Sequence, residues 1–422
     1  MSRERMYIRF GVHKDRDVLK QLRDSFAGVI VPAHILSHSS DATRAAVDYI
    51  DRAFFIDPMT YILTSENIKS YVTQNKEKDG IKFKMSIEKM TEEYGLLDYF
   101  KARDYKELEP SDFTDKFIED LCIKNKDFQC SKLNSHAESA YKKYSEILAA
   151  VDPESFKAVD HQPIYIVPPY FYSPKVGDAW HKINIKLAQK TQELCNGSQV
   201  VAPILLTSAD NLVKELLDDY SNFKELILWA TDLDETKPTT DDRHIKKLKS
   251  LRDFVDLSVE KNVKITNLYG SYYSALLTKR GLKGFSNGIF YGEYKDFRKK
   301  IGGGAPPARF YISALHSFYL VPVALAILQD NPKLFDMESQ ATKILLDDDF
   351  TNISRMSLDS VLAQKHFLYA REHEFSRLDT MDAGNARDEL EENFKLHGNY
   401  GDYIKEGKPL SLLAWHAALS DD

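Results

Sequence analysis

ELILWATDLDETKPTTDDRHIKKLKSLRDFVDLSVEKNVKITNL, residues 225–268, is the stretch that decides the fold class. It begins and ends with short, almost continuously apolar runs, Glu225–Ala230 and Val263–Leu268, and an amphipathic run, Asp241–Lys261, lies between them. Such apolar runs are typical of strands that are covered on both faces, and the amphipathic run is typical of a covering helix. The stretch therefore predicts one strand–helix–strand unit of a parallel sheet.

The same alternation continues on both sides of this stretch. Further strands are predicted at Met6–Phe10, Ala27–Pro32, Ala53–Asp57, Pro163–Pro168, Gln199–Leu206, Gly284–Tyr291 and Ala308–Ser313. The helices predicted between them include Asp15–Phe26, Asp41–Ile50, Asp178–Leu194 and Ala209–Tyr220. The chain thus has one strand more than an eight-stranded barrel holds, so that one strand lies outside the barrel or is wrongly predicted. The regular alternation favours an α/β fold with a parallel (β/α)8-type barrel, and a doubly wound open sheet is the alternative.

The alternation stops after the third strand. Residues 61–155 are polar, rich in lysine and glutamate and patterned as helices, without a convincing strand. Because this is far longer than a normal connection between a strand and a helix, we interpret it as a helical insertion, a lid or a small subdomain. The expected domains are a barrel of residues 1–60 and 156–320, the insertion 61–155, and a helical C-terminal region, 321–422, packed on the barrel.

Composition narrows the classes of protein. The 422 residues carry a net charge of −7, so that nothing indicates a nucleic-acid partner. Three cysteines without a CxxC pair predict a reducing compartment, and we expect a cytoplasmic protein. No apolar run approaches the roughly 18 residues that a membrane helix needs, and the N-terminal residues do not resemble a signal peptide. We therefore expect a soluble protein with no membrane partner.

The carboxyl ends of the barrel strands should carry the site, because the loops that follow them build the active sites of barrels. Asp57 ends the third strand in Phe-Ile-Asp-Pro, where burial would suit a general base. The alternative is a turn aspartate that bonds to the backbone beside Pro58. His34, after the second strand, is the third catalytic candidate, beside Asp57 and Glu293.

Glu293 follows the strand that ends in Gly-Ile-Phe-Tyr-Gly-Glu, residues 288–293. These six residues resemble strand ends in barrels that exchange nucleobases. An aspartate and a glutamate on different strands can form an acid/base pair, although a glutamate at a helix start is the alternative for Glu293. His34 and His38 stand four apart, but no glutamate lies between them as in HExxH, and they precede a capping Ser-Ser-Asp. No metal site is predicted.

Other polar and aromatic residues at strand ends are candidates for substrate binding. They are Tyr170, Asp232, Tyr269, Asn287, Tyr291 and His316. Tyrosine rings stack on planar ligands, or else they pack against the insertion. Asp232 belongs to an acidic group with Asp234 and Glu235 that could take Mg²⁺, but a solvated loop that caps the next helix is favoured. His366, Arg371, His373 and Glu374 are interpreted as a salt-bridged surface or an interface.

Two hypotheses on function follow. The first is a barrel enzyme, a hydrolase or group transferase, that acts on a planar, sugar-bearing or nucleotide-like ligand with carboxylate acid/base chemistry. The second is a non-catalytic recognition or scaffold subunit that binds a protein partner through the insertion or the C-terminal helices. No motif identifies a cofactor, and the cofactor stays unknown.

Overall fold

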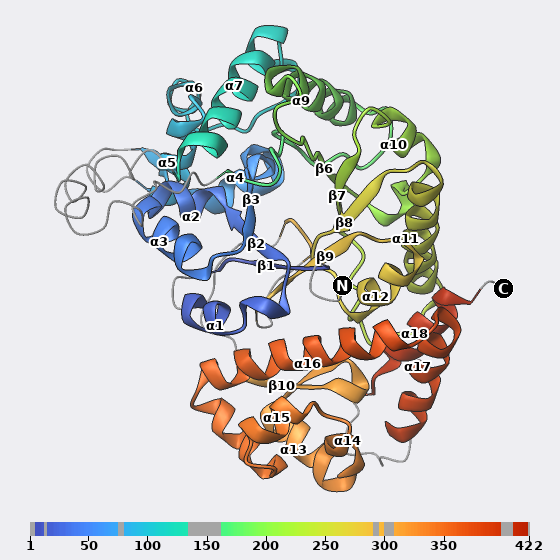
Figure 1. Ribbon diagram of the computed structural model, residues 1–422. Coiled ribbons are helices and arrows are strands. Elements are labelled where there is room, and N and C mark those ends of the chain that lie inside the picture. Colours follow the sequence, from blue (N-terminus) through green and yellow to red (C-terminus); the bar gives the residue numbers. More distant parts are fainter. Residues whose placement is uncertain are drawn as a thin grey trace, which may run out of the picture. The chain divides into compact units, whose positions relative to one another are not determined.

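The computed structural model of the chain describes residues 5–11, 15–74, 80–133, 162–289, 295–298, 308–397 and 408–420. Seven strands form a parallel sheet that curls into an open half-barrel (Figure 1). They are β1 (Met6–Arg9), β2 (Gly28–Pro32), β3 (Ala53–Asp57), β6 (Ile204–Thr207), β7 (Glu225–Ala230), β8 (Lys264–Asn267) and β9 (Gly284–Gly288). Their order is β3-β2-β1-β9-β8-β7-β6. The predicted α/β class with a parallel sheet is confirmed.

Apolar continuity and one glycine explain how these strands pack. Every residue of β2 and of β6 is buried, as expected for strands that are covered on both faces. In β9, Gly284 lies so close to the residue before β1 that a Cβ would stand 2.5 Å from the carbonyl oxygen of Arg5. A side chain at this position would therefore push β1 and β9 apart, and the register that pairs Met6 with Phe285 depends on glycine here.

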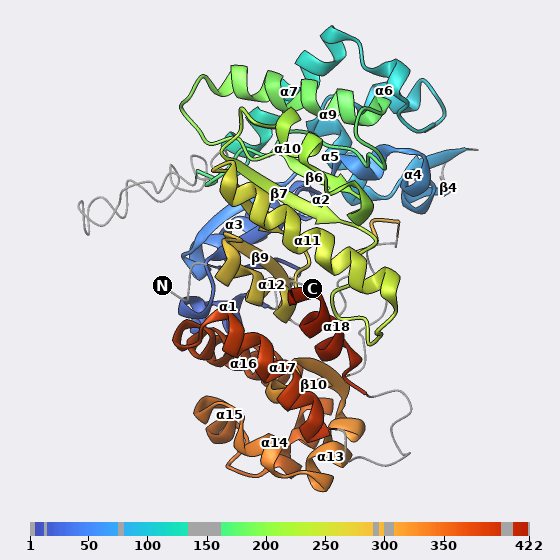
Figure 2. The ribbon, with the colours of Figure 1, turned by 90° about the vertical axis from the view of Figure 1, so that its right-hand side faces the viewer.

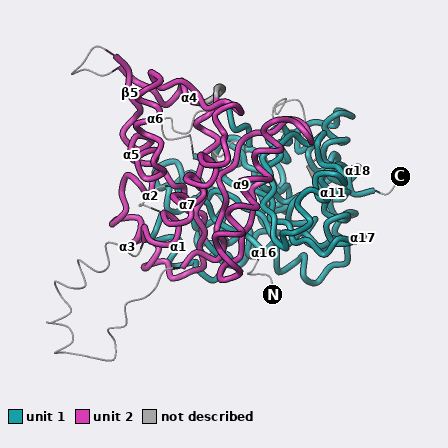
Figure 3. Tube along the Cα trace, turned by 90° about the horizontal axis from the view of Figure 1, so that it is seen from above, with its two compact units in different colours: residues 1–28, 205–422 teal, residues 29–204 magenta. Residues whose placement is uncertain are grey.

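The chain divides into two compact units, drawn in different colours in Figure 3. Unit 1 consists of Met1–Gly28 and Leu205–Asp422, and unit 2 consists of Val29–Ile204. In unit 2 the helices are α2 (Ala33–His38), α3 (Ser40–Ile50), α4 (Ser65–Tyr71), α5 (Met85–Glu93), α6 (Leu97–Lys101), α7 (Asp115–Ser131) and α9 (Ala179–Cys195). In unit 1 they are α1 (Arg16–Gln21), α10 (Lys214–Asp219), α11 (Asp242–Glu260), α12 (Tyr272–Leu277), α13 (Val321–Asp330), α14 (Lys333–Asp336), α15 (Gln340–Leu345), α16 (Ser360–Thr380), α17 (Ala383–His397) and α18 (Leu410–Leu419).

The predicted strand Pro163–Pro168 is reduced to a single parallel bridge between Ile166 and Val201. The segment still has backbone hydrogen bonds on both sides within unit 2. Ile164 N donates to Phe54 O of β3 over 2.9 Å, and Ala202 N donates to Ile166 O over 3.0 Å. Prolines supply no amide hydrogen, so those at both ends of this segment keep it from forming a longer ladder.

The predicted strand Ala308–Ser313 does not belong to the parallel sheet. Its residues form β10 (Arg309–Ile312), which pairs antiparallel with β11 (Ser317–Leu320) in a separate hairpin. The connection is too short for the crossover that a parallel neighbour requires. Helix α13 begins at Val321, directly after the last residue of β11.

Two further expectations in unit 2 are wrong. The insertion contains a short antiparallel hairpin, β4 (Val72–Gln74) with β5 (Ile81–Phe83), where no strand was expected. The segment that holds His34 and His38 is itself a helix, α2, whereas the sequence analysis placed it before the start of a helix. Both elements are short, and pairing between neighbouring segments decides such elements more than their own sequence pattern does.

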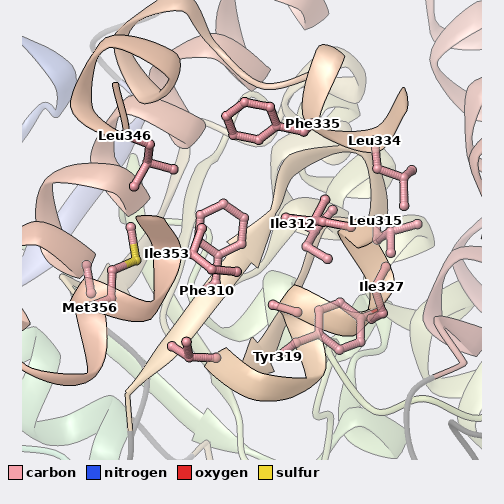
Figure 4. Close-up of a cluster of buried hydrophobic side chains, with 14 of the residues drawn as sticks. Phe310, Ile312, Leu315, Tyr319, Ile327, Leu334, Phe335, Leu346, Ile353 and Met356 are labelled. Atoms are coloured by element: carbon pink, nitrogen blue, oxygen red, sulfur yellow. The ribbon is translucent and has the colours of Figure 1, made fainter. Parts of the chain in front are cut away.

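The C-terminal part of unit 1 has its own apolar core beneath the β10–β11 hairpin (Figure 4). Phe310, Ile312 and Leu315 are completely buried there, together with side chains from α13 and α14. Elsewhere in unit 1, α18 lies along α11 (Figure 2), and Arg252 of α11 donates hydrogen bonds to the carbonyl oxygens of Ala418 and Ser420. No helix of the described residues is long and apolar enough to cross a membrane.

Candidate functional site

Asp57 is the last residue of β3 and is completely buried. Its Oδ1 accepts a hydrogen bond of 2.8 Å from the Tyr170 hydroxyl and one of 2.9 Å from the backbone amide of Met59. Tyr170 is fixed in turn by Thr60, whose Oγ1 accepts from the backbone amide and donates to the carbonyl oxygen of Tyr170, both over 2.8 Å. Buried hydroxyl and amide donors therefore hold this carboxylate.

His34 contacts the side chain of Met59. Its Nδ1 is 2.9 Å from Met59 Sδ, and its side chain is half-buried. Met59 has the left-handed backbone conformation, with φ of 54°, which is uncommon for a residue other than glycine and turns the chain sharply after Pro58. We call Asp57, Met59, Thr60, Tyr170 and His34 the Asp57 cluster. Asp57 and Tyr170, both predicted for the site, are in direct contact, and Met59 links His34 to Asp57.

Tyrosine rings surround the Asp57 cluster. The rings of Tyr61 and Tyr170 are 5.7 Å apart, and the Tyr94 hydroxyl donates to the carbonyl oxygen of Pro58 over 2.9 Å. Burial, and next the nearby Asp57 carboxylate, hold the pKa of Tyr94 well above its ordinary value. Tyr94 therefore keeps its proton and acts as a hydrogen-bond donor at neutral pH.

The other predicted residues that the structure describes lie in unit 1. Asp232 is exposed, accepts a hydrogen bond of 2.7 Å from the amide of Ala209 and pairs with Lys247. Tyr269 packs against Trp229 with the two rings tilted by 45° and their centroids 4.8 Å apart, and Asn287 pairs with Ile8 in the register of β9 and β1. Glu293 and Tyr291 lie outside the described residues, so their roles stay predictions.

Glu235 forms a second buried carboxylate centre, in unit 1. It is completely buried, and Asn267 at the end of β8 donates to its Oε1 over 2.8 Å. The amide of Ser271 donates to Oε2 over 2.7 Å, and the Ser274 hydroxyl also donates to the carboxylate. Lys295 Nζ lies 3.2 Å from Oε1, and its side chain is 5% exposed. We call these five residues the Glu235 cluster.

Charge compensation decides the ionisation of Glu235. Burial by itself acts to raise the pKa of its carboxyl group, but Lys295 and the hydrogen bonds from Ser271 and Ser274 outweigh burial and lower it. The carboxylate is therefore ionised at neutral pH. It also receives amides from the first turn of α12, so the cluster locks the end of β8 to that helix.

A third polar centre joins the β10–β11 hairpin to α16. His316 Nδ1 and the Tyr311 hydroxyl each lie 2.6 Å from Glu374 Oε1, and Arg371 donates to Oε2 over 2.6 Å. The ring of Tyr272 stacks on the imidazole, with centroids 3.4 Å apart and planes 6° from parallel. We call these five residues the Glu374 cluster.

Two other buried titratable groups lie near the Glu374 cluster. Glu338 accepts hydrogen bonds from the amide and the hydroxyl of Ser313, over 2.8 and 2.6 Å. Burial raises the pKa of Glu338 from 4.5 to about 8. Burial lowers the pKa of His366 to about 4; its ring nitrogens contact Thr342 and the carbonyl oxygen of Tyr311.

Two interpretations of the sequence are therefore corrected. Glu235 does not belong to a solvated loop, and the cap of the next helix, α11, is Asp241, which accepts from the His244 amide. His366, Arg371 and Glu374 do not form a surface, because all three are buried, while His373 is half-buried. Charged residues in a polar stretch are normally solvated, so only the partners supplied by distant segments reveal that these are buried.

Among the described residues, no group of three or more histidine, cysteine, aspartate or glutamate side chains is arranged to hold a metal ion. Comparison of the chain with protein-family models, with curated proteins and with solved structures finds no match.

Proposed function

We propose that the protein is an enzyme, a hydrolase or group transferase, that acts at the Asp57 cluster on a planar, sugar-bearing or nucleotide-like ligand. One observation carries the proposal. Asp57 is completely buried at the carboxyl end of a parallel strand and accepts a hydrogen bond from the Tyr170 hydroxyl. In α/β proteins the carboxyl ends of parallel strands are where ligands bind and where catalytic residues lie.

The proposed roles follow from the contacts. Asp57 is the general base, and the Tyr170 hydroxyl, 2.8 Å away, passes or orients the proton. His34 is half-buried and provides an imidazole that orients the ligand. The tyrosine rings at 61 and 170 favour a planar ligand, since aromatic faces stack on bases and sugars. Glu293 stays a catalytic candidate from the sequence alone, because it lies outside the described residues.

Two broader expectations belong to the same proposal. We propose that the fold is a (β/α)8-type barrel in which residues 163–168 supply the eighth strand, supported by their backbone hydrogen bonds to Phe54 and Ala202. We also propose a cytoplasmic location, supported by three cysteines without a disulfide, of which Cys122 and Cys195 are buried.

Thermal unfolding in the presence of ligands tests the function. The full chain is screened against nucleobases, nucleosides, nucleotides and sugar phosphates, beside the variant Asp57→Asn. Asn keeps an oxygen that accepts from Tyr170 but cannot take up a proton as a base. A class that raises the melting temperature of the parent is then incubated with the protein, and its hydrolysis or transfer is followed by chromatography.

The matched control is Asp15→Asn. Asp15 is also a buried aspartate, and the Gln364 amide donates to it over 2.9 Å, but it belongs to unit 1. We expect turnover by the parent and by Asp15→Asn, and at least a 100-fold loss in Asp57→Asn. Equal turnover by Asp57→Asn and the parent would show that Asp57 is not the base.

The scaffold hypothesis is the second candidate, and exposed apolar side chains favour it. Leu358 is 94% exposed and Ile344 is 69% exposed, both in the C-terminal part of unit 1. An exposed apolar side chain can bury its surface against a protein partner. Two results together would support the scaffold hypothesis. No ligand class would shift the melting temperature, and a protein partner would bind the parent but not Leu358→Ser.

A further inference from the structure

In the Glu374 cluster a carboxylate contacts one ring nitrogen of a histidine, as it does in sites where a histidine transfers protons. Burial acts to raise the pKa of Glu374, but Arg371 and then His316 outweigh burial and lower it. Glu374 is therefore a carboxylate at neutral pH and only accepts hydrogen bonds. Since Glu374 Oε1 lies 2.6 Å from His316 Nδ1, the proton of a neutral imidazole must sit on Nδ1.

In that neutral form the opposite ring nitrogen of His316 carries a lone pair and accepts hydrogen bonds. His316 Nε2 is buried and has no hydrogen-bond partner among the described residues. A buried polar atom that is left without a partner costs about 1–3 kcal/mol, so such atoms are rare in folded proteins and require an explanation. The side chain of His316 is 2% exposed, so bulk water does not provide that explanation.

Strain and stacking fix the ring in this orientation. His316 closes the β10–β11 hairpin in the left-handed backbone conformation, with φ of 47°. Its ring lies flat on Tyr272, and its carboxylate partner is held by Tyr311 and Arg371. A base that a third group orients, and whose second nitrogen is open, is the arrangement that activates a hydroxyl in hydrolases of unrelated folds.

We propose that His316 and Glu374 form a second proton-transfer site, at which His316 Nε2 takes a proton from a small neutral ligand with an acidic O–H or N–H group. The O–H or N–H bond of the ligand breaks, its electron pair stays on the ligand, and an N–H bond forms at Nε2. Glu374 stabilises the resulting imidazolium. A neutral ligand is favoured because Arg371 already balances the charge of Glu374.

Reaction of the full-length protein with diethyl pyrocarbonate tests the site. This small electrophile is attacked by the lone pair of a neutral imidazole, and mass spectrometry of peptides gives the rate at each histidine. His366 is an internal control in the same part of unit 1. It is as buried as His316, and its pKa of about 4 keeps it neutral at pH 7, but both of its ring nitrogens have partners.

We expect His316 to react at least 10-fold faster than His366 at pH 7. Equal rates would overturn the proposal, because they would show that Nε2 is closed to small molecules. In Glu374→Gln the amide oxygen still accepts from Nδ1 but the charge is gone, so the rate at His316 should fall at least threefold. An unchanged rate would overturn the role of Glu374.

Glu374→Gln could also fail to fold, and His366 would report this by becoming reactive. Tyr311→Phe then replaces it as the test variant. It removes one donor from Glu374 Oε1, so that the carboxylate accepts more strongly from Nδ1 and the rate at His316 should rise. A rate that stays constant or falls would contradict the proposal.

Discussion

Asp57 and Glu235 are both buried carboxylates close to the carboxyl ends of parallel strands, but their surroundings differ. Glu235 follows β7 and is paired with Lys295, and two serines and an asparagine add hydrogen bonds. The donors given above for Asp57 are neutral, a tyrosine hydroxyl and a backbone amide. The contacts given for the two carboxylates therefore differ in chemical kind.

The difference separates a structural carboxylate from a candidate base. A carboxylate paired with a buried lysine resists protonation and cannot lose its charge without leaving the lysine uncompensated. Asp57 accepts instead from the Tyr170 hydroxyl, a group that can hand on a proton. We therefore place the proposed chemistry at Asp57 and assign Glu235 to holding α12 against the end of β8.

The sharpest test neutralises Glu235 without changing its shape. Glu235→Gln leaves the Lys295 ammonium buried and without its counter-charge. We expect the free energy of unfolding, measured by urea denaturation, to fall by about 3–5 kcal/mol. Adding Lys295→Met to the same chain should restore much of the loss. A loss below about 1 kcal/mol in Glu235→Gln would remove the distinction between the two clusters.

Glu338 extends the comparison to a buried carboxyl group that two hydrogen bonds from Ser313 hold. Its pKa is about 8 in the folded chain, against 4.5 ordinarily, so that between these values the folded state holds a proton that the unfolded state releases. Stability should therefore fall as the pH rises from 4.5 to 8, by at most about 1.4 kcal/mol per pH unit.

Glu338→Gln isolates this contribution. The amide oxygen still accepts from Ser313 but does not titrate, so that the variant should lose less stability than the parent between pH 5 and pH 8. Urea denaturation of both proteins across this range gives the difference. Parallel curves would indicate that Glu338 is ionised in the folded protein.

Asp57→Asn is the counterpart of Glu235→Gln. It preserves an oxygen that accepts from Tyr170 and Met59, so the change in the free energy of unfolding should stay within about 1.5 kcal/mol, in either direction. The same denaturation experiment measures it. A loss as large as that of Glu235→Gln would show that Asp57 is also a structural ion.

The smallest effect is expected at Tyr170→Phe. It removes the hydroxyl that donates to Asp57 and keeps the ring against Tyr61. The loss in unfolding free energy should be about 0.5–1.5 kcal/mol, the usual contribution of one hydrogen bond. If the Asp57 cluster is catalytic, Tyr170→Phe should lower turnover by more than the change in unfolding free energy accounts for. A small loss of both turnover and stability would weaken the proposal.

The candidate site could be predicted in part from the sequence. The rule that strand ends carry function selects Asp57, Tyr170 and His34, and the structure brings these three together. The same rule also selects Asp232, which is exposed in a loop of unit 1, and His316, which lies in the β10–β11 hairpin; their predicted roles stay predictions. The sequence analysis did not identify Glu235 and Glu374 as buried, because many of their partners are far away in the sequence. One such partner is Trp415, whose indole N–H donates to the Glu235 carbonyl oxygen.

The amino-acid sequence by itself determined the local elements. Continuous apolar runs specify β3 and β7 with the predicted bounds, and an amphipathic period specifies α11. These patterns are local because each element gains stability by burying its own apolar side chains. Only the tertiary structure decided that β10 leaves the parallel sheet, and which charged side chains lose their water. Both outcomes depend on partners that are brought close by folding, and the free energy of a buried charge is set by those partners and not by its neighbours in the chain.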